Sequence, residues 1–177
     1  LAIQWILEDN RGTPRAQTSL LKAVIDSLPQ STLESIVNNK IEDASQIHKA
    51  LVMLRGRDEK DTSLKLLRHV LEERFQQILE ITLTAMEPLC APNVISIIRA
   101  GIRTLDDRYM ANACEALNSI PNRQLTQQLG QLIQDAFMPK RAIAAASAGD
   151  IDMVLESLSQ RPDTWLQECA RSALFNL

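Results

Sequence analysis

The sequence contains few aromatic residues, cysteines and glycines. Aromatic side chains make up 3% of its 177 residues, and the apolar content is carried by leucine, isoleucine, alanine and valine. This composition favours helices over strands. The three cysteines are an odd number at wide spacing, which does not resemble a disulfide framework or a zinc module and fits a reducing cytosol. Without strands, no glycine-rich phosphate-binding loop is expected.

The chain also lacks a long hydrophobic run and a strong charge of either sign. No apolar segment approaches the roughly 20 residues needed to cross a bilayer, and no secretory signal peptide is recognisable. The formal net charge is −3, so neither nucleic acid nor a membrane surface is expected as a partner.

We expect a cytoplasmic protein, or a segment on the cytoplasmic side of a membrane-anchored parent. Because Leu1 stands inside a helical pattern, we also expect a fragment of a larger protein.

The sequence is rich in helical periodicity. Apolar residues recur every three or four positions in two long stretches, 31–55 and 62–88, so each set lies on one stripe of a helix. With the charged turn at 56–61, the pattern predicts two helices of about 25 residues, each about 38 Å long, packed as an antiparallel hairpin. The first stripe comprises Leu33, Ile36, Val37, Ile41, Ala44, Ile47, Leu51 and Leu54, and the second Leu64, Leu67, Leu71, Phe75, Ile78 and Met86, extending to Leu89.

Shorter helices are predicted after Pro92, over 93–102, 107–120, 123–137, 140–148, 150–159 and 163–176. Asp106, Asp150 and Asp163 stand at helix starts, where a carboxylate accepts unpaired backbone N–H groups.

Two of these helices share a skeleton fifty-seven residues apart. The spacing Ala-x-x-Ala-Leu puts small and large side chains on one face, which lets neighbouring helices approach closely and interlock. The identical pairs are Asp106 with Asp163, Ala113 with Ala170, Ala116 with Ala173 and Leu117 with Leu174. Two further pairs match in type as large side chains, Tyr109 with Leu166 and Ile120 with Leu177.

This skeleton resembles the HEAT-repeat family, an α-solenoid fold whose repeats stack through such faces. The resemblance covers residues 93–177 and implies an α-α superhelix, with extra helical material near 123–148 because the usual period is about 40–47 residues. We expect a single all-α domain over 1–177, with a degenerate repeat in 1–28, the hairpin in 29–91 and HEAT-like repeats in 92–177. Residues 58–177 also resemble the soluble helical segment of nucleotide-transporter-like membrane proteins.

No group of residues predicts catalysis, a metal site or a cofactor site. His48 and His69 have no cysteine, aspartate or glutamate at metal-ligand spacing, and no nucleophile is placed to use either histidine as its base. Cys114 and Cys169 lie on or beside the alanine face, where small buried thiols are expected. The acidic pairs are explained by helix capping or by solvated surface. The chain is therefore not expected to be an enzyme.

Four residues are candidates for contact with a partner: Arg99, Arg103, Arg108 and Trp165. The first two arginines lie one helical turn apart and the third opens the next helix, so together they suit an anionic peptide, a phosphate-bearing ligand or an acidic sister domain. The alternative is a solvated face with ion pairs to the neighbouring aspartates. Trp165 is either a partner-binding aromatic or a wedge against the preceding helix.

HEAT repeats specify a shape rather than a reaction. The leading hypothesis is a non-catalytic helical-repeat scaffold that binds a protein, or a sister domain of the same chain, through a groove between stacked helices. The first alternative is a cytoplasmic regulatory segment of a transporter-like membrane protein. The second is an enzyme of chromophore-lyase or DNA-glycosylase type on the same scaffold. Base excision needs a basic groove and aromatic side chains that stack on bases. An acidic chain with two tryptophans and one tyrosine supplies little of either.

Overall fold

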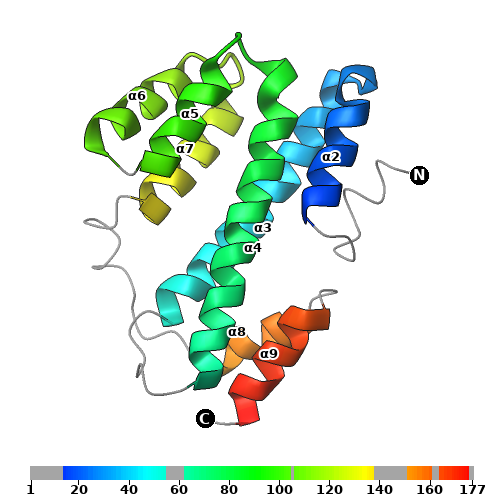
Figure 1. Cartoon of the computed structure of the whole chain (residues 1–177), viewed down its shortest axis with the longest axis vertical. Helices are drawn as coiled ribbons and strands as arrows, with labels where there is room; N and C mark the ends of the chain where they lie inside the picture. The colour runs from blue at the N-terminus through cyan, green and yellow to red at the C-terminus, as the bar shows by residue number, and fades with distance from the viewer. Residues whose placement is uncertain (1–13, 55–61, 105, 138–150, 161–163, 176–177) are drawn as a thin grey trace.

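The structure, a computed structural model, describes residues 14–54, 62–104, 106–137, 151–160 and 164–175. Within these ranges every regular element is helical, so the all-α prediction is confirmed (Figure 1). The α-helices are α2 (Pro14–Val24), α3 (Gln30–Leu54), α4 (Thr62–Met86), α5 (Val94–Thr104), α6 (Asp107–Asn118), α7 (Arg123–Phe137), α8 (Ile151–Ser159) and α9 (Thr164–Phe175), and the short 3-10 helices are η1 (Ile25–Ser27) and η2 (Glu87–Leu89).

The antiparallel pair of α3 and α4 forms the centre of the molecule (Figure 1). Both helices have 25 residues, as the periodicity predicts. All residues of the two predicted apolar stripes are buried except Leu89, which is only partly buried at the end of η2. The hairpin and its contact face are therefore confirmed. Residues 81–86 of α4 are all buried, and α2, α5 and α9 also pack against this helix. The hairpin is therefore the framework that positions the shorter helices.

Apart from α2, which packs on α4, the shorter helices pack on the hairpin in two groups. Figure 1 shows α5, α6 and α7 at the upper end and the α8–α9 pair at the lower end. In the first group α5 packs on α4 and α7 packs on α3, with α6 against both α5 and α7. In the second, α9 contacts α4 and α8 contacts α3. One continuous hydrophobic core extends from Leu21 of α2 to Ala173 of α9.

Local sequence signals set several helix boundaries. α2 begins at Pro14, whose fixed φ suits the first helical position. Asp106 caps α6 as predicted, because its Oδ1 accepts a hydrogen bond from the Arg108 backbone N–H at 2.9 Å. Before α5, Asn93 has φ of 74°, a left-handed conformation that asparagine tolerates better than most residues. The predicted caps Asp150 and Asp163 and the predicted helix at 140–148 lie outside the described residues.

The two copies of the repeated skeleton agree at their first alanine and differ at the next two matched positions. Ala116 is partly buried where Ala173 is fully buried, and Leu174 is partly buried where Leu117 is buried. Ala113 and Ala170 are both fully buried. Gly101 of α5 approaches α6 so closely that a Cβ on it would lie 2.7 Å from the Ala113 Cβ and 2.8 Å from the Tyr109 backbone oxygen. The match of Tyr109 with Leu166 does not extend to their surroundings, since Tyr109 is 52% exposed and Leu166 1%. At Tyr109 it is the main chain that faces α5, and the ring is left in solvent.

Candidate binding groove

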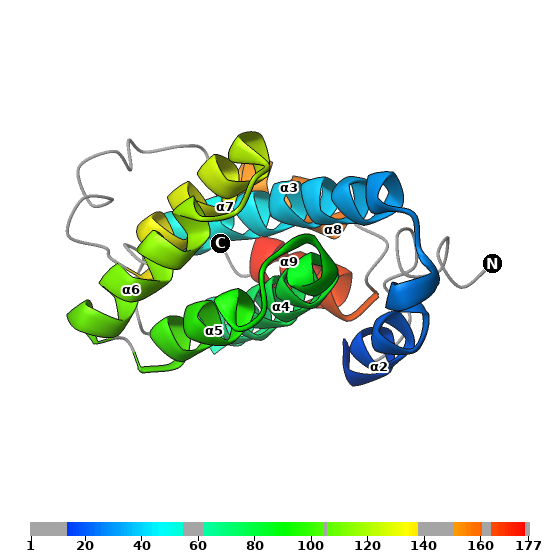
Figure 2. The ribbon, with the colours of Figure 1, turned by 90° about the horizontal axis from the view of Figure 1, so that it is seen from above.

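A groove runs between α3 and α7 and has a volume of about 810 Å³. This size lies within the range of known ligand sites. Figure 2 shows α7 beside α3, with both helices running in the same direction. α7 packs on α3, and the groove is lined beside this contact by polar side chains of both helices and by the buried Leu132.

Each helix contributes a row of polar side chains with the same spacing. The α3 row is Asn38, Glu42, Ser45 and Lys49, and the α7 row is Gln124, Gln128, Gln131 and Asp135. Steps of four, three and four residues keep a row on one face of a helix. Asn39 and Gln127 add to the two rows from the adjoining positions. The groove therefore has two polar walls of matched length.

The floor of the groove is apolar and well packed. Ile41 and Leu132 line it and are each only 5% exposed. His48 also lines the groove and is buried. Its ring centroid lies 5.9 Å from the ring centroid of Phe75, and the ring centroids of Phe75 and Phe137 are 6.1 Å apart. These ring contacts connect α3, α4 and α7 beneath the groove. Both walls of the groove therefore pack against Phe75 of α4.

Carboxamides dominate the walls. Asn38, Asn39, Gln124, Gln127, Gln128 and Gln131 all line the groove and all are exposed. Each offers two N–H donors and a carbonyl acceptor. Gln131 Nε2 donates to Asp135 Oδ1 at 2.8 Å, and the other five make no hydrogen bond to another side chain in the part of the chain that is described. The walls thus present mostly unused donors and acceptors.

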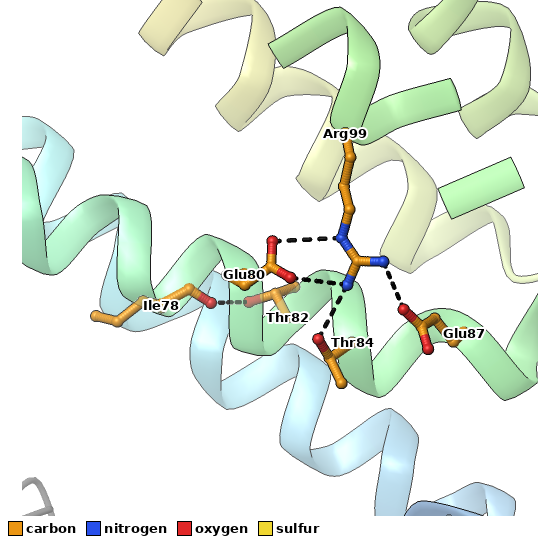
Figure 3. Close-up of polar contacts among 6 residues, drawn as sticks. All are labelled: Ile78, Glu80, Thr82, Thr84, Glu87 and Arg99. Carbon is orange, nitrogen blue, oxygen red and sulfur yellow. Dashed lines mark hydrogen bonds and ion pairs between the residues drawn. The ribbon is translucent and has the colours of Figure 1, made fainter. Parts of the chain in front are cut away.

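The predicted arginine surface has a different arrangement. Arg99 points at α4 and η2, where its guanidinium donates to Glu80, to the Thr84 hydroxyl at 3.0 Å and to Glu87 (Figure 3). Burial lowers the pKa of Arg99, but hydrogen bonding to Glu87 and attraction by Glu80 outweigh burial and raise it. Figure 3 also shows Thr82 donating to the Ile78 carbonyl at 2.8 Å, which satisfies a buried hydroxyl within α4. Arg99 therefore anchors α5 to the hairpin.

Of the other partner-contact candidates, Arg103 lies near Arg99 and Arg108 does not share their recess. Arg103 lines a recess of about 60 Å³ beside Arg99, a space of a few water molecules at most. Arg108 is exposed on α6 and does not line that recess. Within the described residues, neither Arg103 nor Arg108 forms an ion pair with the neighbouring aspartates. The side chain of Trp165 lies outside the described residues.

The remaining reactive side chains are dispersed. His69 is 67% exposed at its side chain and lies 3.5 Å from Glu73. Cys169 is buried, and burial raises the pKa of the half-buried Cys90 thiol to about 11, which keeps it protonated near neutral pH. Among the described residues, no three histidine, cysteine, aspartate or glutamate side chains gather where they could bind a metal.

None of the described helices has the length and apolarity to span a membrane.

Comparisons with known proteins do not assign the groove. No protein-family model, no curated protein and no solved structure matches the chain.

The sequence contains a signal for this groove that composition alone does not reveal. The 15-residue helix α7 carries five glutamines, and four of them line the groove. The pair Asn38–Asn39 stands on the polar side of α3. Periodicity identifies both polar faces but does not indicate that α3 and α7, which are separated by four other helices in the chain, lie side by side. That pairing requires the structure.

Proposed function

We propose that this chain is a non-catalytic helical scaffold that binds a protein, or a sister domain of the same chain, through the groove between α3 and α7. The observation that carries the proposal is the pair of matched polar walls over a packed apolar floor. Protein interfaces combine a small apolar centre with a polar rim that forms hydrogen bonds. Ile41 and Leu132 supply that centre, and the exposed carboxamides supply the rim.

We also propose that the α5–α6 and α8–α9 pairs are units of a HEAT-like solenoid built around the long hairpin. The support is their shared use of a buried alanine, Ala113 in one pair and Ala170 in the other, on the second helix. Small residues at these positions let the helices of a pair approach closely. In this arrangement the hairpin separates the two units and provides α3 as one wall of the groove.

The proposed function can be tested by site-specific photo-crosslinking in cells that express the protein. The photoreactive residue p-benzoylphenylalanine replaces Gln128 in the groove or, as a matched control, Gln134, which is exposed on the same helix but does not line the groove. We expect discrete protein adducts from Gln128→p-benzoylphenylalanine and few from Gln134→p-benzoylphenylalanine. Equal adduct patterns, or no adducts from either position, would contradict the proposal.

A further inference from the structure

We infer that the groove between α3 and α7 binds an extended polypeptide segment of about five residues, held mainly through its main chain. The inference rests on the proposed protein-binding function and specifies the conformation of the partner. It comes from three features of the groove: hydrogen-bonding groups on both walls, the length of the two rows, and the apolar floor between them.

The first feature fits the two edges of an extended chain. In a strand, successive peptide groups point their N–H and C=O alternately to opposite edges. A segment lying along the groove would therefore direct one set of peptide groups at α3 and the other at α7. Asn38 and Asn39 face one edge, and Gln127 and Gln128 face the other. A carboxamide is itself an amide, so it can pair with a peptide N–H and C=O at once.

The second feature sets the length. The α3 row spans 38–49 and the α7 row spans 124–135, which is twelve residues and eleven steps along the helix in each case. At about 1.5 Å per residue a row is roughly 16 Å long. An extended chain advances about 3.3 Å per residue, so the rows accommodate about five residues. A bound helix would leave the carboxamides without main-chain partners, because helical peptide groups are already paired with one another.

The third feature sets side-chain preference. Side chains of an extended segment alternate between the floor and solvent. The floor at Ile41 and Leu132 is apolar, so we expect apolar residues at alternate positions. The wall charges are Glu42, Lys49 and Asp135, a net acidic set that disfavours the phosphates of a nucleic acid. We therefore do not expect single-stranded nucleic acid to occupy the groove, and the experiments below include it as a competing ligand.

The first experiment selects ligands from a random twelve-residue peptide library displayed on phage, with the full chain as bait. Synthetic copies of the selected peptides are then measured by fluorescence anisotropy. The double substitution Gln127→Ala and Gln128→Ala is expected to weaken binding about tenfold or more, since at least two hydrogen bonds are lost. The control Gln134→Ala, a carboxamide on the same helix outside the groove, is expected to change binding less than twofold. Circular dichroism checks that both variants fold.

The second experiment tests the main-chain contacts. N-methylation of one peptide group at a time removes a donor and leaves every side chain in place. We expect losses at consecutive positions across about five residues, with full affinity retained outside that window. Amide spectra of ¹⁵N-labelled protein should show shifts of the Gln127 and Gln128 side-chain NH₂ signals on peptide addition.

The outcomes separate the two proposals. If peptides bind and respond to Gln127→Ala and Gln128→Ala but tolerate every N-methylation, or bind as helices, the extended-segment inference is wrong and the protein-binding function stands. If no peptide is selected and Gln128→p-benzoylphenylalanine also gives no adducts, both are wrong. Tighter, salt-sensitive binding of a single-stranded oligonucleotide that displaces the peptides would also overturn the inference.

Discussion

Two glycines in helix interiors, Gly101 and Gly130, have opposite surroundings. A Cβ on Gly101 would come within 2.8 Å of the Tyr109 backbone oxygen, whereas a Cβ on Gly130 would meet nothing within 4 Å. Glycine weakens a helix interior relative to alanine. That cost is offset at Gly101 by the close approach of α5 and α6 that the missing side chain permits, and at Gly130 no contact offsets it.

The substitutions Gly101→Ala and Gly130→Ala should therefore act in opposite directions. Gly101→Ala should lower the free energy of unfolding by about 1–3 kcal/mol, because α5 and α6 must separate to admit the methyl group. Gly130→Ala should raise it by about 0.5–1 kcal/mol through helix propensity alone. Urea titrations followed by circular dichroism measure both values. A stabilised Gly101→Ala variant would show that the α5–α6 contact is looser than described.

Lys40 is a buried cation on α3 that disfavours folding near neutral pH. Its side chain is 4% exposed and its ammonium lies 3.7 Å from Asp43. Burial lowers the pKa of Lys40, and Asp43 opposes this only in part. The unfolded chain therefore binds this proton more tightly, so stability should rise with pH between the folded pKa and the ordinary value near 10.5.

Replacing Lys40 with an apolar residue should remove this pH dependence. Lys40→Met is expected to raise the free energy of unfolding at pH 7 by about 1 kcal/mol, as buried charges often give way to apolar side chains without loss. The advantage over the parent should shrink as the pH approaches 10.5. Urea titrations at pH 7 and pH 10 test this, with exposed Lys49→Met as the control. An advantage that grows with pH would contradict the assignment.

At the scale of helices, Arg99 is the polar link between α5 and the hairpin. Its hydrogen bonds connect α5 to η2 and to the C-terminal part of α4. A guanidinium can bond several acceptors in one plane, which an ammonium cannot do. Since the Glu80 and Glu87 side chains are about 40% exposed, solvent screens part of the attraction. The link should therefore contribute moderately to stability.

We expect Arg99→Ala to lower the free energy of unfolding by roughly 1–2 kcal/mol, because charged hydrogen bonds are lost and the buried Thr84 hydroxyl loses its partner. Arg99→Lys should recover part of this loss. The exposed neighbour Arg103→Ala should change stability by less than about 0.5 kcal/mol. Chemical denaturation of the three variants provides the comparison. Equal losses for Arg99→Ala and Arg103→Ala would refute the anchoring role.

The sequence predicts the helices far better than their arrangement. The ranges of α3, α4 and α7 follow from the period of their apolar residues, and the Asp106 cap follows from local hydrogen-bonding chemistry. Both are properties of neighbouring residues in the chain. The Arg99 contacts and the α3–α7 groove depend on which helices meet, and many pairings satisfy the same amphipathic pattern. Arg99 was therefore identifiable as a notable residue from sequence, while its partners on α4 were not.

At the scale of the whole molecule, three helices meet at Phe75 beneath the groove. Its ring on α4 lies against His48 of α3 and Phe137 of α7. It is 4% exposed and belongs to the continuous core. The relative position of the two groove walls should depend on this ring more than on any residue of the walls themselves, because the wall residues are exposed and make few contacts with each other.

Phe75→Leu should therefore loosen α7 while the hairpin and the α8–α9 pair persist. The smaller side chain leaves an unfilled space and should lower the free energy of unfolding by roughly 1–2 kcal/mol. In hydrogen exchange, the free energy of opening at the amides of α7 should fall by more than the global free energy of unfolding does, because α7 also opens locally. The amides of α9 should lose only the global amount. Equal loss of protection in α7 and α9 would mean that the aromatic cluster stabilises the core as a whole and does not specifically hold the groove together.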